Sequence, residues 1–208
     1  MKLHESTLNR ILRDKLIAVV RLDDAEQAHT IIEAIAAGGI TTIEITLTTP
    51  GAPELIEEFA GRDDLLIGAG TVLDAESAWR VIEAGARFYA SPIFDPELIR
   101  VAREAGTVSM PGAYTPTEIV SAWHLGGDII KIFPMPSDGV KFLESLRAPL
   151  PQVRLAPSGG VTSDTAAKLL KAGAAALNVG TWLTHEPGGE PGTFERIRER
   201  AATLVKTV

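Results

Sequence analysis

The sequence contains no cysteine. Disulfides, thiolate metal ligands and a cysteine nucleophile are therefore excluded. It also lacks an apolar run long enough for a signal peptide or a membrane span, and it opens on the polar stretch Met1–Ser6. We therefore expect a cytoplasmic protein without a membrane partner.

Basic clusters are also missing, and the formal net charge is −7. This balance argues against nucleic acid as a partner. An anionic small molecule is compatible with it, provided that the site creates its own local positive field. The 208 residues, 45% of them hydrophobic, are enough for one well-buried core, so we expect a single domain over residues 1–208.

A repeated unit runs through the chain. A helical stretch ends in glycine, and a short strand begins a few residues later. The unit is about 20 residues long, which is one helix plus one strand. Eight strands are predicted, at Leu16–Arg21, Thr42–Leu47, Leu65–Ala69, Arg87–Ala90, Thr107–Met110, Ile129–Phe133, Val153–Ala156 and Ala175–Val179.

Helices are predicted between these strands, and their alternation sets the fold class. Examples are Asp24–Ala37, Asp74–Ala84, Pro96–Ala105, Thr115–Leu125 and Asp164–Ala172, with an extra N-terminal helix at Leu3–Arg13 and a closing helix at Thr193–Val205. Eight alternating units predict an α/β protein, and the simplest closed form is the (β/α)8 TIM barrel. A doubly wound open sheet is the alternative, but a long glycine-rich first turn is not seen.

Lys131 stands in the apolar run Asp128–Pro134, which is typical of a strand buried on both faces. The neutral amine of such a lysine can attack a carbonyl group. If Lys131 is considered alone, the better interpretation is that it lies at a strand end and extends its amine to water. Arg21 and Glu44 stand at other strand ends, however, and side-chain alternation turns all three residues toward the barrel interior. We expect them to meet near its top as a reactive site; a purely structural ion-pair network is the alternative.

Two glycine turns predict a phosphate-binding site. Ser158-Gly159-Gly160 follows the seventh strand, and Gly180-Thr181 follows the eighth. The loops after these two strands commonly bind phosphate in such barrels, through backbone N–H groups. The alternative is a tight turn with Ser163 as an ordinary helix cap.

The histidines do not indicate a metal site. None lies at a predicted strand end or has the spacing of a metal-ligand pair. They are interpreted as surface or packing residues: His4, His29, His124 and His185.

Seven segments between about Leu16 and Leu183 resemble, in order, the bacterial 2-keto-3-deoxy-6-phosphogluconate (KDPG) aldolase and 4-hydroxy-2-oxoglutarate (KHG) aldolase family. They are Ile43–Leu47, Gly68–Leu73, Ala90–Pro92, Pro111-Gly112, Lys131–Pro134, Ser158–Val161 and Val179–Leu183. The resemblance implies a metal-independent class I aldolase on a β/α barrel, without a cofactor and usually a homotrimer.

The resemblance also implies residue roles. Lys131 matches the Schiff-base lysine, Glu44 the general acid/base, and Thr71 a residue that holds the pyruvate carboxylate. Residues in the other matching segments are expected to bind substrate or its phosphate: Pro92, Phe133, Ser158, Gly159, Gly160, Gly180 and Thr181. Many members carry arginine where this chain has Thr48; others have an arginine at the end of the first strand instead, so Arg21 is assigned to the carboxylate.

The expected reaction is cleavage of 2-dehydro-3-deoxy-6-phosphogluconate to pyruvate and glyceraldehyde 3-phosphate, with 4-hydroxy-2-oxoglutarate, which yields glyoxylate, as a further substrate. A 2-dehydro-3-deoxy-6-phosphogalactonate aldolase is the nearest alternative, because those enzymes also lack the arginine. A phosphate-binding barrel isomerase or epimerase and a non-catalytic barrel scaffold are alternatives from other classes.

Overall fold

The computed structural model describes residues 3–208, so Met1 and Lys2 of the polar opening lie outside the described part. Each of the eight predicted strand regions contains a strand: β1 Leu16–Val20, β2 Thr42–Thr46, β3 Leu66–Gly70, β4 Phe88–Ala90, β5 Val108–Met110, β7 Ile130–Ile132, β8 Leu155–Pro157 and β9 Leu177–Val179. An additional two-residue strand, β6 (Gly112–Ala113), was not predicted. It continues the path of β5 beyond Pro111.

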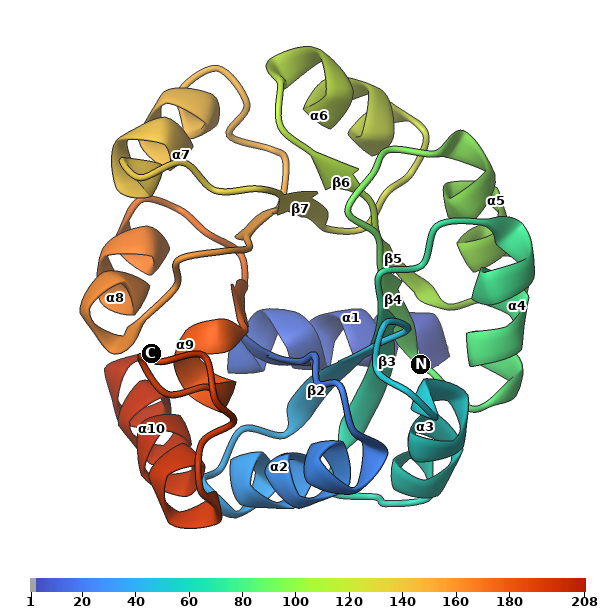
Figure 1. The fold of residues 1–208 in the computed structure, drawn as a ribbon. Helices are drawn as coiled ribbons and strands as arrows, with labels where there is room; N and C mark the ends of the chain where they lie inside the picture. Colours follow the sequence, from blue (N-terminus) through green and yellow to red (C-terminus); the bar gives the residue numbers. More distant parts are fainter. Residues whose placement is uncertain (1–2) are drawn as a thin grey trace.

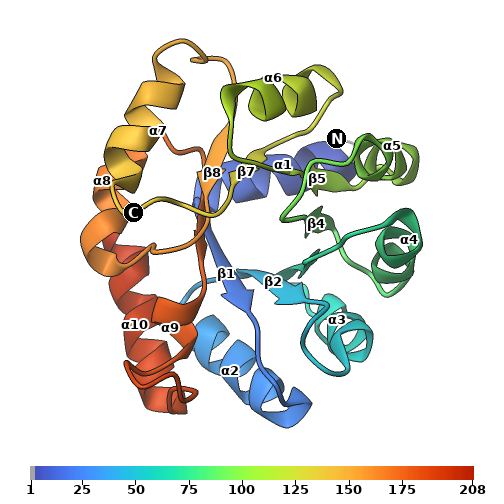
Figure 2. The same ribbon diagram turned by 45° about the horizontal axis from the view of Figure 1, so that its top comes forward.

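The strands form a closed parallel barrel (Figures 1 and 2). Six of them pair in the order β5-β4-β3-β2-β1-β9, and three pair in the order β6-β7-β8. The chain itself joins the two groups where β5 runs into β6. On the other side, a parallel bridge between Ser158 and Asn178 joins β8 to β9. The predicted eightfold β/α barrel is therefore confirmed, and the open sheet is not the fold.

The helices lie outside the ring of strands, with one exception (Figure 1). The outer helices are α2 Ala25–Ala37, α3 Ala52–Ala60, α4 Ala75–Glu83, α5 Pro96–Ala105, α6 Pro116–His124, α7 Gly139–Arg147, α8 Ser163–Lys171, the short α9 Thr181–Thr184, and α10 Phe194–Thr207. The exception is α1 (Leu3–Asp14), the predicted N-terminal helix. Ile11 of α1 packs into the same cluster as Ile17 and Ile129 of the barrel interior, so α1 closes the end of the barrel where the strands begin.

Side-chain alternation divides the apolar residues into two clusters. Ile43 and Ile45 of β2 point outward and pack with the helices, whereas Ile17, Phe88 and Ile129 fill the barrel interior. Each strand thus turns every second residue inward. This alternation places Glu44 and Lys131 inside the barrel.

Most helices begin where a side chain caps them. Asp24, Asp74 and Asp95 each accept a hydrogen bond from a backbone N–H in the first turn, which satisfies a donor that the helix leaves unpaired. The suggestion that Ser163 caps α8 was wrong. Thr162 is the cap residue, and its backbone N–H donates to the Thr165 hydroxyl over 2.9 Å.

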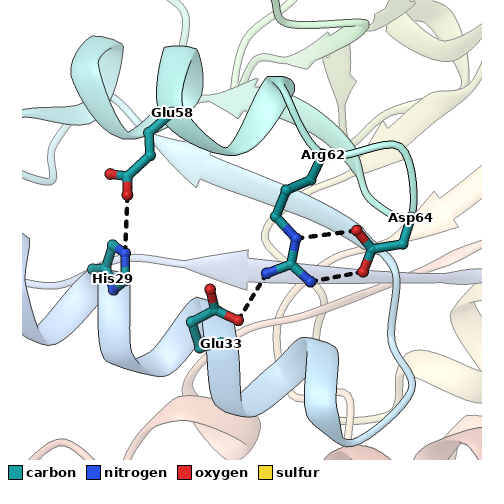
Figure 3. A network of polar contacts seen from close by, with 5 residues as sticks. All are labelled: His29, Glu33, Glu58, Arg62 and Asp64. Carbon is teal, nitrogen blue, oxygen red and sulfur yellow. Dashed lines mark hydrogen bonds and ion pairs between the residues drawn. The ribbon is translucent and has the colours of Figure 1, made fainter.

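Polar contacts link α2 to α3 and the loop that follows it (Figure 3). Arg62 donates to Glu33 of α2 over 2.8 Å and to both carboxylate oxygens of Asp64 over 3.0 and 2.7 Å. Hydrogen bonds to Asp64, then to Glu33, raise the pKa of Arg62. His29 and Glu58 form a second link over 3.1 Å.

Candidate active site

Lys131 and Glu44 form a buried pair inside the barrel. Glu44 is the middle residue of β2, and Lys131 is the middle residue of β7. The amine Nζ lies 3.0 Å from Oε1 and 3.4 Å from Oε2 of the carboxylate. Lys131 is 5% exposed and Glu44 is fully buried. Burial strengthens their attraction and gives proton transfer between them a short path.

Two glycines, Gly70 beside Glu44 and Gly112 beside Lys131, allow close packing around this pair. A methyl group at Gly70 of β3 would overlap the side chain of Glu44, and one at Gly112 would overlap the backbone of Pro92. Neighbouring atoms can come close to the backbone at these two positions because glycine has no Cβ. The motifs Gly68–Leu73 and Pro111-Gly112 therefore have a steric role beside the buried pair.

Arg21 is not part of the Lys131–Glu44 pair. It follows β1 at the mouth of the barrel, is exposed, and donates from Nη2 to the hydroxyl of Thr71 over 3.2 Å. Thr71 has a positive φ of 57°, a conformation that is strained for a β-branched residue and is often found at functional sites. The structure thus brings the predicted residues together as two pairs, one buried and one at the rim.

A cleft of about 450 Å³ opens at the same end of the barrel. Arg21 and Phe133 line it together with both glycine turns, Ser158–Gly160 and Gly180-Thr181. Gly159 and Gly160 have positive φ values of 105° and 65°. Glycine adopts such values without strain, whereas a residue with a side chain would be strained there. One cleft therefore joins the predicted phosphate site to the rim arginine.

Comparison with known proteins identifies the family. The family model for KDPG and KHG aldolases matches residues 8–199. The chain belongs to the KDPG and KHG aldolase family. Membership makes it an aldolase, a lyase that cleaves a carbon–carbon bond, and the resemblance of the seven sequence segments is confirmed.

Relatives in the KDPG and KHG aldolase family align over nearly the whole chain. A probable 2-dehydro-3-deoxy-6-phosphogalactonate aldolase from Rhizobium meliloti (strain 1021) is 36% identical, over 91% of this chain and 89% of the relative. The KHG/KDPG aldolase of Escherichia coli (strain K12) is 31% identical, over 92% of this chain and 91% of the relative. A Legionella pneumophila KDPG aldolase, solved with pyruvate captured as a covalent carbinolamine, has a TM-score of 0.85 at 29% identity, over 95% and 97% of the two chains.

Thr48 belongs to a cluster of threonine hydroxyls at the end of β2. Its hydroxyl lies 3.0 Å from that of Thr46, which in turn lies 3.3 Å from the hydroxyl of Thr49. Thr49 also accepts a hydrogen bond from the backbone of Leu22 over 3.2 Å. This position of the aldolase therefore holds a neutral hydroxyl cluster, which ties the end of β2 to the segment after Arg21.

Several residues at the site were not predicted from the sequence. His185, interpreted as a surface or packing residue, lines the cleft together with Asp23, Trp182 and Thr184. The signal for them was weak, because all four stand in loops or in the short α9, where no periodic pattern marks a direction. Trp182 lies in the matching segment Val179–Leu183, but no role was assigned to it from the sequence. Within residues 3–208, no three His, Asp or Glu side chains come together as ligands for a metal ion. No helix in the same range is long and apolar enough to cross a membrane.

Proposed function

We propose that this aldolase is a class I enzyme that cleaves a 2-keto-3-deoxy-6-phospho sugar acid, with KDPG as the first substrate to test. The observation that carries the proposal is the buried contact between Lys131 Nζ and Glu44 Oε1 over 3.0 Å. KHG, which carries no phosphate, is a further substrate of the same chemistry. Pyruvate is the product common to both.

Lys131 is the proposed nucleophile. Glu44 takes a proton from the ammonium group, and the neutral amine attacks the ketone carbon. The ketone oxygen takes up the proton that the nitrogen then loses, which gives the carbinolamine. Glu44 then gives the proton from the ammonium group to the hydroxyl of the carbinolamine, which leaves as water. The resulting iminium accepts the electron pair of the bond between the third and fourth substrate carbons, so that this bond breaks. Glu44 also removes the C4 hydroxyl proton and later protonates the enamine.

Arg21 and Thr71 are proposed to hold the carboxylate of the pyruvate moiety. Their contact at the rim supports this assignment, and a guanidinium can bind both carboxylate oxygens. The cleft beside them supports a phosphate at Ser158–Gly160 and Gly180-Thr181, with Phe133 on its wall. Pro92, whose backbone is close to Gly112, would border the site on the other side.

A phosphogalactonate substrate is the second candidate. It is favoured by Thr48, because Thr46, Thr48 and Thr49 form a neutral hydroxyl cluster at the position where the resemblance leads us to expect arginine in many family members. KDPG and its galactonate isomer differ in one hydroxyl configuration, and a few contacts decide between such substrates. Comparison of kcat/KM for the two compounds and for KHG would rank them.

The decisive test is reduction of the imine. The protein is incubated with pyruvate and sodium borohydride, and then examined by intact-mass spectrometry and peptide mapping. We expect one reduced pyruvate adduct on Lys131 and none in Lys131→Met. Glu44→Gln should retain binding but lower kcat by ~10²–10⁴. Folded wild-type protein without an adduct would overturn the proposal and favour an isomerase or a scaffold.

We also infer that the active form is a homotrimer. Apolar side chains are exposed in three loops that follow neighbouring strands: Leu73 at 49%, Ile93 at 45% and Tyr114 at 40%. Trp79 on the adjacent α4 is 37% exposed. Large apolar side chains exposed on neighbouring loops are typical of a subunit interface.

A further inference from the structure

Asn178 carries a buried amide that has no hydrogen-bond partner in the described part of the chain. It is the middle residue of β9, is 1% exposed, and neither its Nδ2 nor its Oδ1 atom has a hydrogen-bond partner within residues 3–208. Buried amides are nearly always hydrogen-bonded, and an exception calls for an explanation. Both neighbours in the strand, Leu177 and Val179, pack outward against the helices, so the Asn178 side chain points into the barrel.

Strand register places Asn178 at the depth of Lys131. Lys131 pairs with Ala156 of β8, and Ser158, two residues further on, pairs with Asn178. In an eight-stranded barrel the strands tilt, so a horizontal layer advances by about one residue per strand. Two steps, from β7 to β8 and from β8 to β9, call for an advance of about two residues, and the two-residue advance from Ala156 to Ser158 leads to Asn178.

The same advance of two residues over two strand pairings leads on from Asn178 to Glu44. Asn178 pairs with Ile17 of β1, and Val19, two residues further on, pairs with Glu44 of β2. The contact between Lys131 and Glu44 confirms that the layer advances in this sense. Asn178 therefore belongs to one interior layer with the lysine and the glutamate, and its strand stands between theirs on one side of the ring.

We propose that Asn178 is a further catalytic residue of the class I reaction proposed above, on which this inference rests. Its Nδ2–H donates a hydrogen bond to the substrate ketone oxygen when Lys131 attacks, and its Oδ1 accepts from the N–H of Lys131. Both amide atoms then gain partners with the reactant bound. A donor aimed at an oxygen that gains negative charge stabilises the transition state.

The bond changes are those of carbinolamine formation and loss of water. The Lys131 nitrogen forms a bond to the ketone carbon, the carbon–oxygen π bond breaks, and the oxygen takes up the proton that the nitrogen loses. The hydroxyl then leaves as water with a proton from Glu44, while the nitrogen lone pair completes the C=N bond. Asn178 transfers no proton in either step.

The test measures how fast the imine forms. Wild type, Asn178→Ala and Asn178→Val are mixed with pyruvate and quenched with borohydride at successive times, and adduct formation is followed by intact mass. We expect both variants to form the adduct about 10²-fold more slowly, the loss typical of removing one such donor. The melting temperature of Asn178→Val should equal or exceed that of wild type, because Val is similar in volume to Asn and the change breaks no hydrogen bond within the described protein. Asn178→Ala should melt somewhat lower, because it leaves a cavity, but should remain folded at the assay temperature.

Thr42→Val is the matched control. The Thr42 hydroxyl is also buried without a partner among residues 3–208, but it lies two residues before Glu44, deeper in the barrel. This variant should form the adduct at the wild-type rate. Wild-type rates in both Asn178 variants would overturn the proposal, as would slower rates that merely follow a loss of folded protein. No adduct in wild type would instead overturn the class I reaction itself.

Discussion

At the scale of single residues, the site depends on which side chains can approach one another closely. The Lys131–Glu44 pair lies deep in the barrel, where water does not screen the two charges. Such a pair is costly to bury, so it contributes little to stability relative to an apolar substitute. The contribution that we propose for it is chemical, because the two groups lie 3.0 Å apart and can exchange a proton.

Gly70 gives a prediction at this scale. A methyl group there would overlap the Oε1, Cδ and Cγ atoms of Glu44, so Gly70→Ala should displace the carboxylate. We expect kcat to fall about 10²-fold, as for other displacements of about 1 Å at a reacting centre. Steady-state kinetics measures the loss, and circular dichroism checks that the variant is folded.

Gly61→Ala is the control, since its added methyl group would meet its nearest atom, the carbonyl oxygen of Glu58, at an ordinary 3.5 Å. It should leave kcat unchanged. Full activity in Gly70→Ala would show that the carboxylate of Glu44 does not need its present position.

At the scale of elements, helix starts are specified locally. In α6, the Glu118 carboxylate accepts the backbone N–H groups of Thr115 and Tyr114 over 2.8 and 3.0 Å, and the Thr115 hydroxyl over 2.9 Å. Glu118 N–H in turn donates to that hydroxyl over 3.3 Å. Hydrogen bonding, first of all from the Thr115 backbone, lowers the pKa of Glu118 below its ordinary 4.5.

The capping box predicts a pH-dependent stability. Because the folded-state pKa of Glu118 is lowered, its contribution is complete above pH 4.5 and is lost as the pH falls through the lowered value. Glu118→Gln should therefore cost about 0.5–1 kcal/mol at pH 7, the size of a capping contribution at a partly exposed site. The difference from wild type should shrink in urea unfolding at lower pH. Glu57→Gln, on the exposed face of α3, is the control; equal costs in both variants at all pH values would contradict the prediction.

At the scale of the whole molecule, the barrel turns one set of loops into a continuous surface. Leu73 and Ile93 follow the neighbouring strands β3 and β4, and Tyr114 follows β6, which continues the path of β5, the next strand after β4. Their exposed side chains therefore lie on one side of the mouth. Sequence separation between them is large, and closure of the barrel brings them together. This surface supports the proposed trimer.

The trimer gives a prediction of mass. Light scattering after size exclusion should give about 66 kDa, three times the 22.1 kDa of one chain. Ile93→Asp should shift this mass toward one chain, because a charge in an apolar interface loses its hydration. Phe194→Asp is the control: Phe194 is 38% exposed at the first turn of α10, away from these loops. A mass of 22 kDa for wild type would contradict the trimer.

The sequence by itself determined the order of strands and helices, because alternation of β-branched strands with capped, glycine-ended helices is a local property. It also determined the family, through motifs such as Lys131–Pro134 and Gly68–Leu73. The two-residue strand β6 could not be predicted from the sequence, because so short a strand has no residue pattern of its own.

Only the tertiary structure decided which side chains meet. Glu44 and Lys131 are 87 residues apart, and their contact depends on the tilt and closure of the barrel. The same geometry directs Arg21 to Thr71 at the rim instead of to the buried pair, and brings His185 into the cleft. It also aligns Asn178 with Lys131 and Glu44, because barrel layers are built from strands that are distant in sequence.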